Sequence, residues 1–255
     1  MALDKLVDST QLDTDLTAVA NAIRTKGGTS AQLAFPVGFV SAVEAIPTGG
    51  GGADWNDIVT KNVTGTVTIT AQRIYEYSFY FQPIEKVVAP NATQFDQYSF
   101  AWCQHLGSCI FPEVTTFSGN GTFSRAGGTS MANTNCILVF PKLALGNVRS
   151  SFERGYFLAV DIGPNTSNLY NDTFYHNTGL QTLGTLILRR TASIVTASTS
   201  GAINGLRDVY VPSALISTYE AATNWSTRVS GGYITFHAIE GSQYENYYAD
   251  GTPIT

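Results

Sequence analysis

Apolar and polar positions recur with a period in the low twenties between residues 84 and 190. In each copy a short aliphatic or β-branched run leads to a proline, and a phenylalanine follows about ten residues later. The prolines are Pro90, Pro112, Pro141 and Pro164, and their partners are Phe100, Phe123, Phe152 and Phe174. A fixed period of this length is typical of stacked repeats, because one unit cannot bury its apolar edge alone.

One unit predicts a strand, a turn and a second apolar anchor. The run before each proline predicts a short strand that ends there, because proline lacks an amide hydrogen and fixes φ. Polar residues then predict a turn, and Phe95, Phe117 and Leu169 supply the second anchor. We expect the later phenylalanine to fill the far side of each unit. The pattern therefore predicts a short β-solenoid. The alternative is a β-sandwich, whose short strands also recur at regular spacing.

The two ends of this region carry related signals. Residues 63–70 alternate with period two, which predicts a half-buried strand or hairpin, and residues 75–80 predict a first, degenerate unit. Residues 185–189 and 209–212 predict further strands, and residues 213–222 predict a short helix. We expect a C-terminal cap here, because the last unit of a stack must not expose its apolar surface. Trp225 is expected to seal that unit; stacking of Trp225 on a ligand is the alternative.

Residues 12–47 predict a helical hairpin. Leu16, Val19 and Ile23 fall on one stripe, and Phe39, Val40 and Val43 form a second stripe after Pro36. The stripes are too small to stabilise an isolated hairpin, so we expect those six residues to form an attachment or oligomer interface. A cap on the solenoid is the alternative, but the glycines at 49–52 predict a flexible linker.

Two segments resemble a known repeat. Residues 98–106, which run from Tyr98 through Cys103 to Leu106, resemble the core of the BspA-type leucine-rich repeat, and residues 111–117 resemble its next segment. The resemblance implies a right-handed solenoid in which each turn adds one strand to a sheet. It also implies binding or structural work, since this repeat has no catalytic set.

A second resemblance covers the N-terminal region. Residues 16–30 and 33–40 resemble the N-terminal module of tail proteins from phages and prophages of gut Firmicutes, and residues 210–226 resemble the cap on BspA-like repeats of such proteins. This second resemblance implies a virion tail protein whose N-terminal part attaches to the particle and whose C-terminal half is displayed. We therefore expect a mainly β, leucine-rich-repeat-like solenoid over 57–240, preceded by a helical attachment module (1–48) and a linker (49–56), and followed by a tail (241–255).

Charge and hydropathy limit the classes of partner that the chain is expected to bind. The chain has 14 basic and 19 acidic side chains and a net charge of −5, which argues against nucleic-acid binding. It shows neither a signal peptide nor an apolar run near the ~18 residues of a membrane span. We expect synthesis in the host cytoplasm, assembly into the virion tail, and no membrane insertion. The expected partners are other copies, other tail proteins and a host-surface glycan or protein. A BspA-like bacterial adhesin is the rival interpretation.

Catalytic and metal-binding chemistry is weakly represented. Cys103, Cys109 and Cys136 are too few for a disulfide framework, and Cys103, His105 and Cys109 match no zinc spacing. We predict no metal, no cofactor and no enzymatic activity. The enzyme alternative is a glycan-cleaving tailspike that uses two carboxylates, for example Glu113 and Asp161, as acid and base.

Candidate binding residues fall in the longest unit and in the C-terminal tail. The unit between Pro112 and Pro141 is longer than its neighbours, and its extra residues lie near 124–133. This polar, glycine-rich stretch predicts a projecting loop that contacts a host glycan or a neighbouring subunit; an inert loop is the alternative. The predicted contact residues are Arg125, Asn133, Tyr156 and Tyr175 at the loop, and Tyr244 and Tyr247 in the tail.

Overall fold

The computed structural model describes residues 16–21, 63–176 and 183–254. The chain divides into two compact units, Met1–Gly49 and Gly50–Thr255. In the first unit a helix covers residues 16–21, where Leu16 is half-buried, Ala20 is buried and Val19 is 49% exposed. Val19 therefore packs little within its own unit. The remaining predicted interface residues, Ile23, Phe39, Val40 and Val43, lie outside the described residues, as do the second predicted helix and the 49–56 linker.

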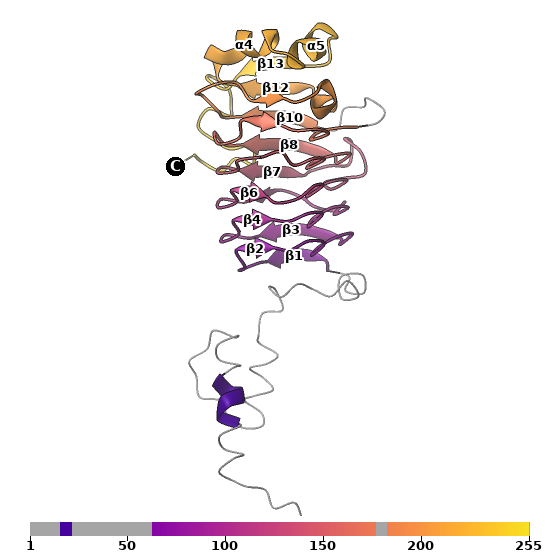
Figure 1. Ribbon diagram of the computed structural model, residues 1–255, viewed down its shortest axis with the longest axis vertical. Helices are drawn as coiled ribbons and strands as arrows, with labels where there is room; N and C mark the ends of the chain where they lie inside the picture. The colour runs from indigo at the N-terminus through magenta and orange to yellow at the C-terminus, as the bar shows by residue number, and fades with distance from the viewer. Residues whose placement is uncertain (1–15, 22–62, 177–182, 255) are drawn as a thin grey trace, which may run out of the picture. The chain divides into compact units, whose positions relative to one another are not determined.

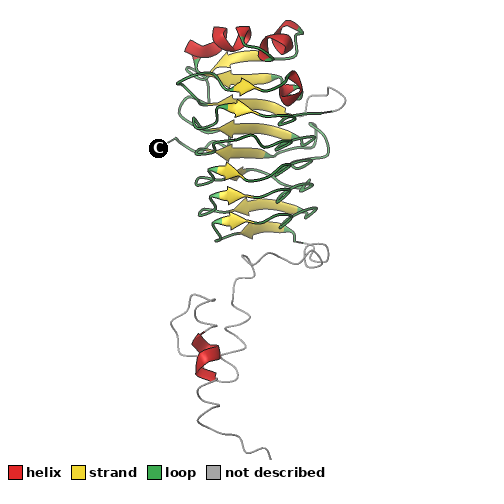
Figure 2. Ribbon diagram, viewed as in Figure 1, coloured by secondary structure: helices red, strands yellow, loops and turns green. Residues whose placement is uncertain are grey.

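The second unit is mainly β, and its strands pair in parallel (Figures 1 and 2). A six-stranded sheet has the order β13-β12-β10-β8-β7-β5, a three-stranded sheet has the order β2-β4-β6, and β1-β3 and β9-β11 form two pairs. The strands are β1 (Gly65–Thr68), β2 (Arg73–Ile74), β3 (Ile84–Val88), β4 (Gln94–Phe95), β5 (Cys109–Ile110), β6 (Thr116–Phe117), β7 (Ile137–Phe140), β8 (Phe157–Ile162), β9 (Asn168–Leu169), β10 (Leu183–Leu188), β11 (Thr196–Ala197), β12 (Asp208–Val211) and β13 (Thr235–Ala238). Since sandwich strands are antiparallel, this pairing contradicts the sandwich alternative.

Each repeat of the chain adds one level to the stack, which we call a rung. A rung begins at one strand of the long-strand series and ends before the next; that series is β1, β3, β5, β7, β8, β10 and β12. Most rungs also contain a short strand on a second side. Figure 1 shows the levels following one another in chain order from β1 and β2 up to β13. β3, β7, β8 and β12 end one or two residues before a proline, as predicted. The segment 63–70 forms the single strand β1, which pairs with β3 and makes no hairpin.

A column of phenylalanines runs through the core. Phe79, Phe100, Phe123, Phe152 and Phe174 stack in consecutive rungs, with centroid separations of 5.3, 5.1, 5.9 and 5.0 Å and interplanar angles of 10° or less. The last four rings are buried, which confirms their predicted place. Phe95, Phe117 and Leu169, the predicted second anchors, are also buried, and Phe95 meets Phe100 edge-on at 5.1 Å. Each column ring thus makes stacked contacts with the rings of neighbouring rungs, and Phe100 makes an edge contact with Phe95 as well.

The third side of each rung is built from turns rather than strands. Its backbone still forms a ladder: the Phe79 amide donates to the Ser99 carbonyl at 2.9 Å, and the Phe100 amide donates to the Thr122 carbonyl at 2.9 Å. In four consecutive rungs two residues that lie four apart have positive φ, for example Tyr98 (53°) and Trp102 (63°). This conformation disfavours side chains that carry a Cβ. The inter-rung hydrogen bonds offset that cost, and they fix the side chains of this side in rows.

The ladder between β3 and β5 is interrupted at a cysteine. The Val87 amide donates to Cys109 Sγ at 3.2 Å, while the Gly107 amide donates to the Glu85 carbonyl at 2.8 Å. A thiol thus replaces one carbonyl acceptor, and β1-β3 form a sheet separate from the six-stranded one.

Helices close the C-terminal end of the stack. After β12 come a 3₁₀ turn (η2, Ser213–Leu215), α4 (Ile216–Ala221) and α5 (Trp225–Ser230). Trp225 is buried and packs edge-on against Tyr219 at 5.4 Å, and its Nε1 donates to the Val195 carbonyl at 2.9 Å. Burial raises the pKa of Tyr219 to about 12. Trp225 therefore occupies a sealing position, not a ligand-stacking one.

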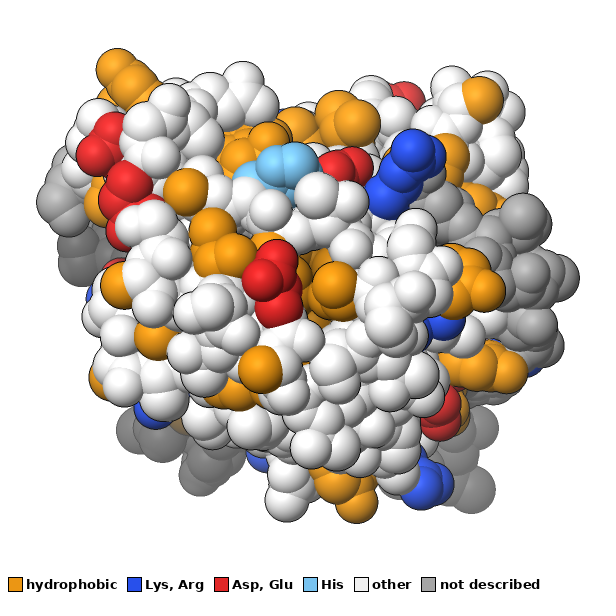
Figure 3. Space-filling view, turned by 90° about the horizontal axis from the view of Figure 1, so that it is seen from above, with side chains coloured by type: hydrophobic (Ala, Val, Ile, Leu, Met, Phe, Trp, Pro, Cys, Tyr) orange, Lys and Arg blue, Asp and Glu red, His pale blue; other side chains and the backbone are white. Residues whose placement is uncertain are grey.

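The cap contains one strand that the sequence reasoning missed. β13 follows α5 and pairs in parallel with β12. Seen from the end that carries these helices, the surface is mostly uncharged, with a few scattered charged groups (Figure 3). Within the described residues, no helix is long and apolar enough to cross a membrane.

Candidate functional site

The C-terminal tail, residues 239–254, returns along the six-stranded sheet. The side chains of Ala159 and Ile187, on the sheet face away from the phenylalanine column, form a small second cluster with Ile239. Tyr244 and Ala249 of the tail pack against this cluster. The tail, which carries the predicted contact residues Tyr244 and Tyr247, thus covers part of its own sheet.

A buried ion pair holds the tail in place. Arg189 binds Asp161 through two hydrogen bonds of 2.7 Å, and the two side chains are 11% and 1% exposed. The same guanidinium donates to the carbonyls of Tyr244 at 2.9 Å and Tyr247 at 2.8 Å. The Ala249 amide donates to Asp161 Oδ2 at 2.9 Å. Burial raises the pKa of Asp161, and the Arg189 guanidinium opposes that rise. The docked tail thus adds hydrogen-bond partners to both charged groups, carbonyls for Arg189 and an amide for Asp161.

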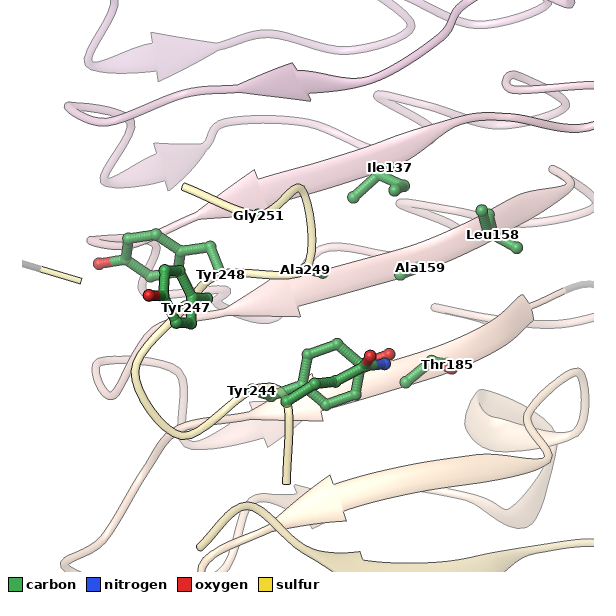
Figure 4. A pocket seen from close by; sticks show the side chains of 10 residues that line it. Ile137, Leu158, Ala159, Thr185, Tyr244, Tyr247, Tyr248, Ala249 and Gly251 are labelled. Atoms are coloured by element: carbon green, nitrogen blue, oxygen red, sulfur yellow. The ribbon is translucent and has the colours of Figure 1, made fainter. Parts of the chain in front are cut away.

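A groove of about 460 Å³ lies between the tail and the sheet, and we call it the tail groove. Its floor is formed by Ile137, Leu158, Ala159 and Thr185, and its wall is formed by tail residues that include Tyr244, Tyr247 and Tyr248. Figure 4 shows the three tyrosines coming from the tail beside β7, β8 and β10. Tyr244 is half-buried and Tyr247 is 48% exposed. The groove can hold a flat, largely apolar group with hydrogen bonds from phenol hydroxyls.

The predicted loop at 124–133 projects less than expected. Ser124 and residues 126–128 are buried, and exposed positions begin at Thr129. The Thr134 hydroxyl donates toward the Tyr156 carbonyl at 2.7 Å and lies 3.1 Å from the Gly127 carbonyl. The extra residues of the long rung are therefore tied down at their base. Only the tip at 129–133 extends outward, with Asn133 exposed.

Arg125 lies on the turn-built side of the stack. Its Cζ lies 4.4 Å from the ring centroid of Trp102, one rung earlier. Arg154 lies one rung later, at the equivalent position, and His176 lies one rung beyond it. Burial, followed by the charges of Arg154 and Arg125, lowers the pKa of His176.

The other predicted contact residues lie around this row. Tyr156 stands 5.9 Å from His176 between ring centroids. Tyr175 lies in the same region, because its carbonyl accepts from the Arg154 amide at 2.9 Å. Among the described residues no hydrogen bond joins Asn133 to Arg125. The structure thus gathers Arg125, Tyr156 and Tyr175, and it places Tyr244 and Tyr247 on a different surface.

The carboxylates of the tailspike alternative are each held by a separate cation. Glu113 accepts from Lys142 Nζ at 2.7 Å through both oxygens, and Asp161 is bound by Arg189. Within the described part of the chain, no hydrogen bond or ion pair joins Glu113 to Asp161. The Asp161 side chain is 1% exposed and is covered by the tail, so it is not accessible to a glycosidic bond.

The three cysteines are buried free thiols. Burial raises the pKa of Cys103 to about 12 and that of Cys109 to about 11, and it raises the pKa of Cys136 well above its ordinary value. Cys103 Sγ donates to the Phe79 carbonyl at 3.0 Å. Protonated thiols of this kind behave as small core side chains.

Sequence reasoning missed Trp102, Arg154 and Arg189. Trp102 and Arg154 could have been found from the repeat, because each lies two residues after a column phenylalanine, Phe100 or Phe152. Arg189 directly follows the apolar run of β10, where an isolated charge is a signal for a partner on the neighbouring strand.

Comparison with known proteins adds no identification. No protein-family profile matches the chain, and no curated protein matches its sequence.

Proposed function

We propose that this chain is a structural protein of a phage virion tail, a fibre, tip or receptor-binding component. Residues 1–48 attach it to other tail proteins or to other copies. The β unit is a short leucine-rich-repeat-like solenoid that is displayed for binding to a host surface or a neighbouring subunit. The resemblance of the N-terminal segment to phage tail modules supports the attachment role.

The observation that carries the proposal is the in-register parallel stack with its filled aromatic core. Strands of consecutive rungs pair residue for residue, as in Leu138–Val160 and Val160–Leu186. Phenylalanine rings occupy the interior of this stack. Its outside presents rows of side chains at the strand spacing of about 4.8 Å. This arrangement suits recognition of an extended surface.

Two measurements test the proposal. Mass spectrometry of purified particles, with gold-labelled antibody in electron microscopy, is expected to find the protein at the tail. Purified protein added to host cells before infection is expected to compete with particle adsorption. Absence from the particles would overturn the tail assignment. Presence in particles without competition for adsorption would limit the role to subunit contacts.

A further inference from the structure

One row of side chains on the turn-built side changes from aromatic to basic along the stack. Phe81, Trp102, Arg125, Arg154 and His176 occupy equivalent positions in five consecutive rungs. Four residues before each of them, at the other end of the same turn, lie Tyr77, Tyr98, Gly121, Ser150 and Asp172. The first four row residues have φ of 64°, 63°, 58° and 54°. Since ladder hydrogen bonds hold this unusual backbone, the row is rigidly placed.

The aromatic half of the row is a closed stack. The rings of Phe81 and Trp102 are 4.7 Å apart with an interplanar angle of 15°, and the Arg125 guanidinium covers the other side of Trp102. Cation–π contact orients this guanidinium. Arg125 is half-buried, and among the described residues no carboxylate forms an ion pair with it.

The cationic half is incompletely neutralised. Arg154 Nε lies 3.3 Å from Glu153 Oε1, yet it is buried without a hydrogen-bond acceptor among the described residues. The Arg125 amide donates to the Glu153 carbonyl at 2.8 Å, so the two arginines lie in directly adjacent rungs. Two like charges on neighbouring rungs repel each other, and an anion between them removes that cost. Phe and Trp fill the equivalent places in earlier rungs, so the stack itself does not require cations here.

Besides the Glu153 carboxylate, the row has hydroxyl, amide and ring groups around it. Tyr156 and Tyr175 lie beside the row, and the tip of the long rung brings the exposed residues Thr129 and Asn133 close in the chain. Such groups suit a polyhydroxylated ligand, whereas a nucleic acid would need a broad basic surface. We call Trp102, Arg125, Arg154 and their two tyrosine neighbours the cationic corner.

We propose that the cationic corner binds an oxyanion carried by a saccharide polymer, with Arg125 and Arg154 as the anion-binding groups. The planar guanidinium matches a carboxylate or a phosphate by two parallel hydrogen bonds. Trp102 positions Arg125, and the tyrosines contact the sugar. The inference rests on the proposed role in surface binding, and it specifies the ligand class and the site.

Titration calorimetry on the full-length chain tests this. The probes are an oligogalacturonate, its methyl ester, a glycerol-phosphate oligomer and poly-glutamate. The two acidic oligomers, the oligogalacturonate and the glycerol-phosphate oligomer, are expected to bind, and the methyl ester is not. Comparison of these two acidic oligomers shows whether a carboxylate or a phosphate on a polyhydroxylated chain is preferred. Affinity is expected to fall with added salt, as for any exposed ionic contact.

Variants locate the site. Arg125→Gln and Arg154→Gln are each expected to weaken binding at least about tenfold, which corresponds to about 1.4 kcal/mol. Arg125→Lys keeps the charge but not the planar fork, so a smaller loss is expected. Lys86→Gln removes an exposed cation from β3, and as the matched control it is expected to change affinity less than about twofold. Melting curves show whether each variant is folded.

Several results would overturn the inference. One is binding of the methyl ester as tight as that of the oligogalacturonate, and another is binding of poly-glutamate as tight as that of the two acidic oligomers. The others are no binding of any probe, and unchanged affinity in folded Arg125→Lys and Arg125→Gln. Absence of the protein from virions would overturn the proposed tail function but would leave a positive binding result standing, so the two failures can be distinguished.

Discussion

Truncation of Phe123 to alanine is the most direct test of the aromatic column. The ring is fully buried between Phe100 at 5.1 Å and Phe152 at 5.9 Å, and it meets Phe140 edge-on at 5.8 Å. Burial of a phenylalanine side chain contributes about 1.5–3 kcal/mol, and each aromatic pair adds about 0.5–1.5 kcal/mol. The expected loss in the free energy of unfolding is therefore about 3–5 kcal/mol.

The neighbouring rings cannot move in to fill the cavity. The Phe123 amide donates to the Ser151 carbonyl at 2.8 Å, and the Phe100 amide is tied to Thr122, so each ring is held in its own rung. The cavity therefore stays open, which places the expected loss toward the upper end of the range. Phe152→Ala is expected to behave in the same way.

Urea titration followed by circular dichroism measures the loss. Tyr233→Ala is the matched control, because that ring is 56% exposed and contacts Arg228 at the surface, so a loss below about 1 kcal/mol is expected. Phe123→Leu combined with Phe152→Leu is expected to be non-additive, whereas Phe100→Leu with Phe174→Leu, which are not in contact, is expected to be additive. Losses below about 1 kcal/mol for both Phe123→Ala and Phe152→Ala would refute the stacked core.

Three further outcomes are expected. Arg189→Met leaves Asp161 buried without its cation, so the free energy of unfolding is expected to fall by about 3–5 kcal/mol. Chymotrypsin is expected to cleave the tail at its tyrosines faster in this variant. An unchanged cleavage rate would mean that the ion pair does not hold the tail. Burial would raise the pKa of Asp96, but hydrogen bonds from Gln94, Ser118 and Arg73 outweigh it and hold the pKa below the ordinary 3.8. Stability from Asp96 is therefore present above that value and is lost as pH falls through the lower folded-state pKa, so chemical denaturation between about pH 5 and pH 3 should show a steeper loss in the native protein than in Asp96→Asn. Deletion of residues 1–49 is expected to leave a folded β unit that no longer assembles into particles; a truncated chain without a cooperative melting transition would contradict this.

The sequence determined the parts of the fold that repeat. The spacing of Phe100, Phe123, Phe152 and Phe174 placed the core column, and the prolines placed the ends of the long strands, because both signals depend only on rung-to-rung equivalence. The cap helix and the buried Trp225 followed from a local apolar pattern. The extent of residues 124–133 was misjudged, because glycines that look like a loop signal can also pack closely in a buried rung, as Gly127 and Gly128 do.

Only the tertiary structure decided what the outside of the stack presents. Positive φ at Tyr98, Trp102 and Arg125 has no sequence signal, because glycine is the usual marker of that conformation and none of these three positions is a glycine. The docking of the tail on Asp161 joins residues 88 positions apart, and the tail residue of that pair, Ala249, lies outside the repeating part of the chain. Periodicity predicts contacts between equivalent residues, whereas a tail that folds back makes contacts that depend on shape and on one buried charge. For that reason the core could be predicted from the sequence, and the arrangement of the outer surfaces could not.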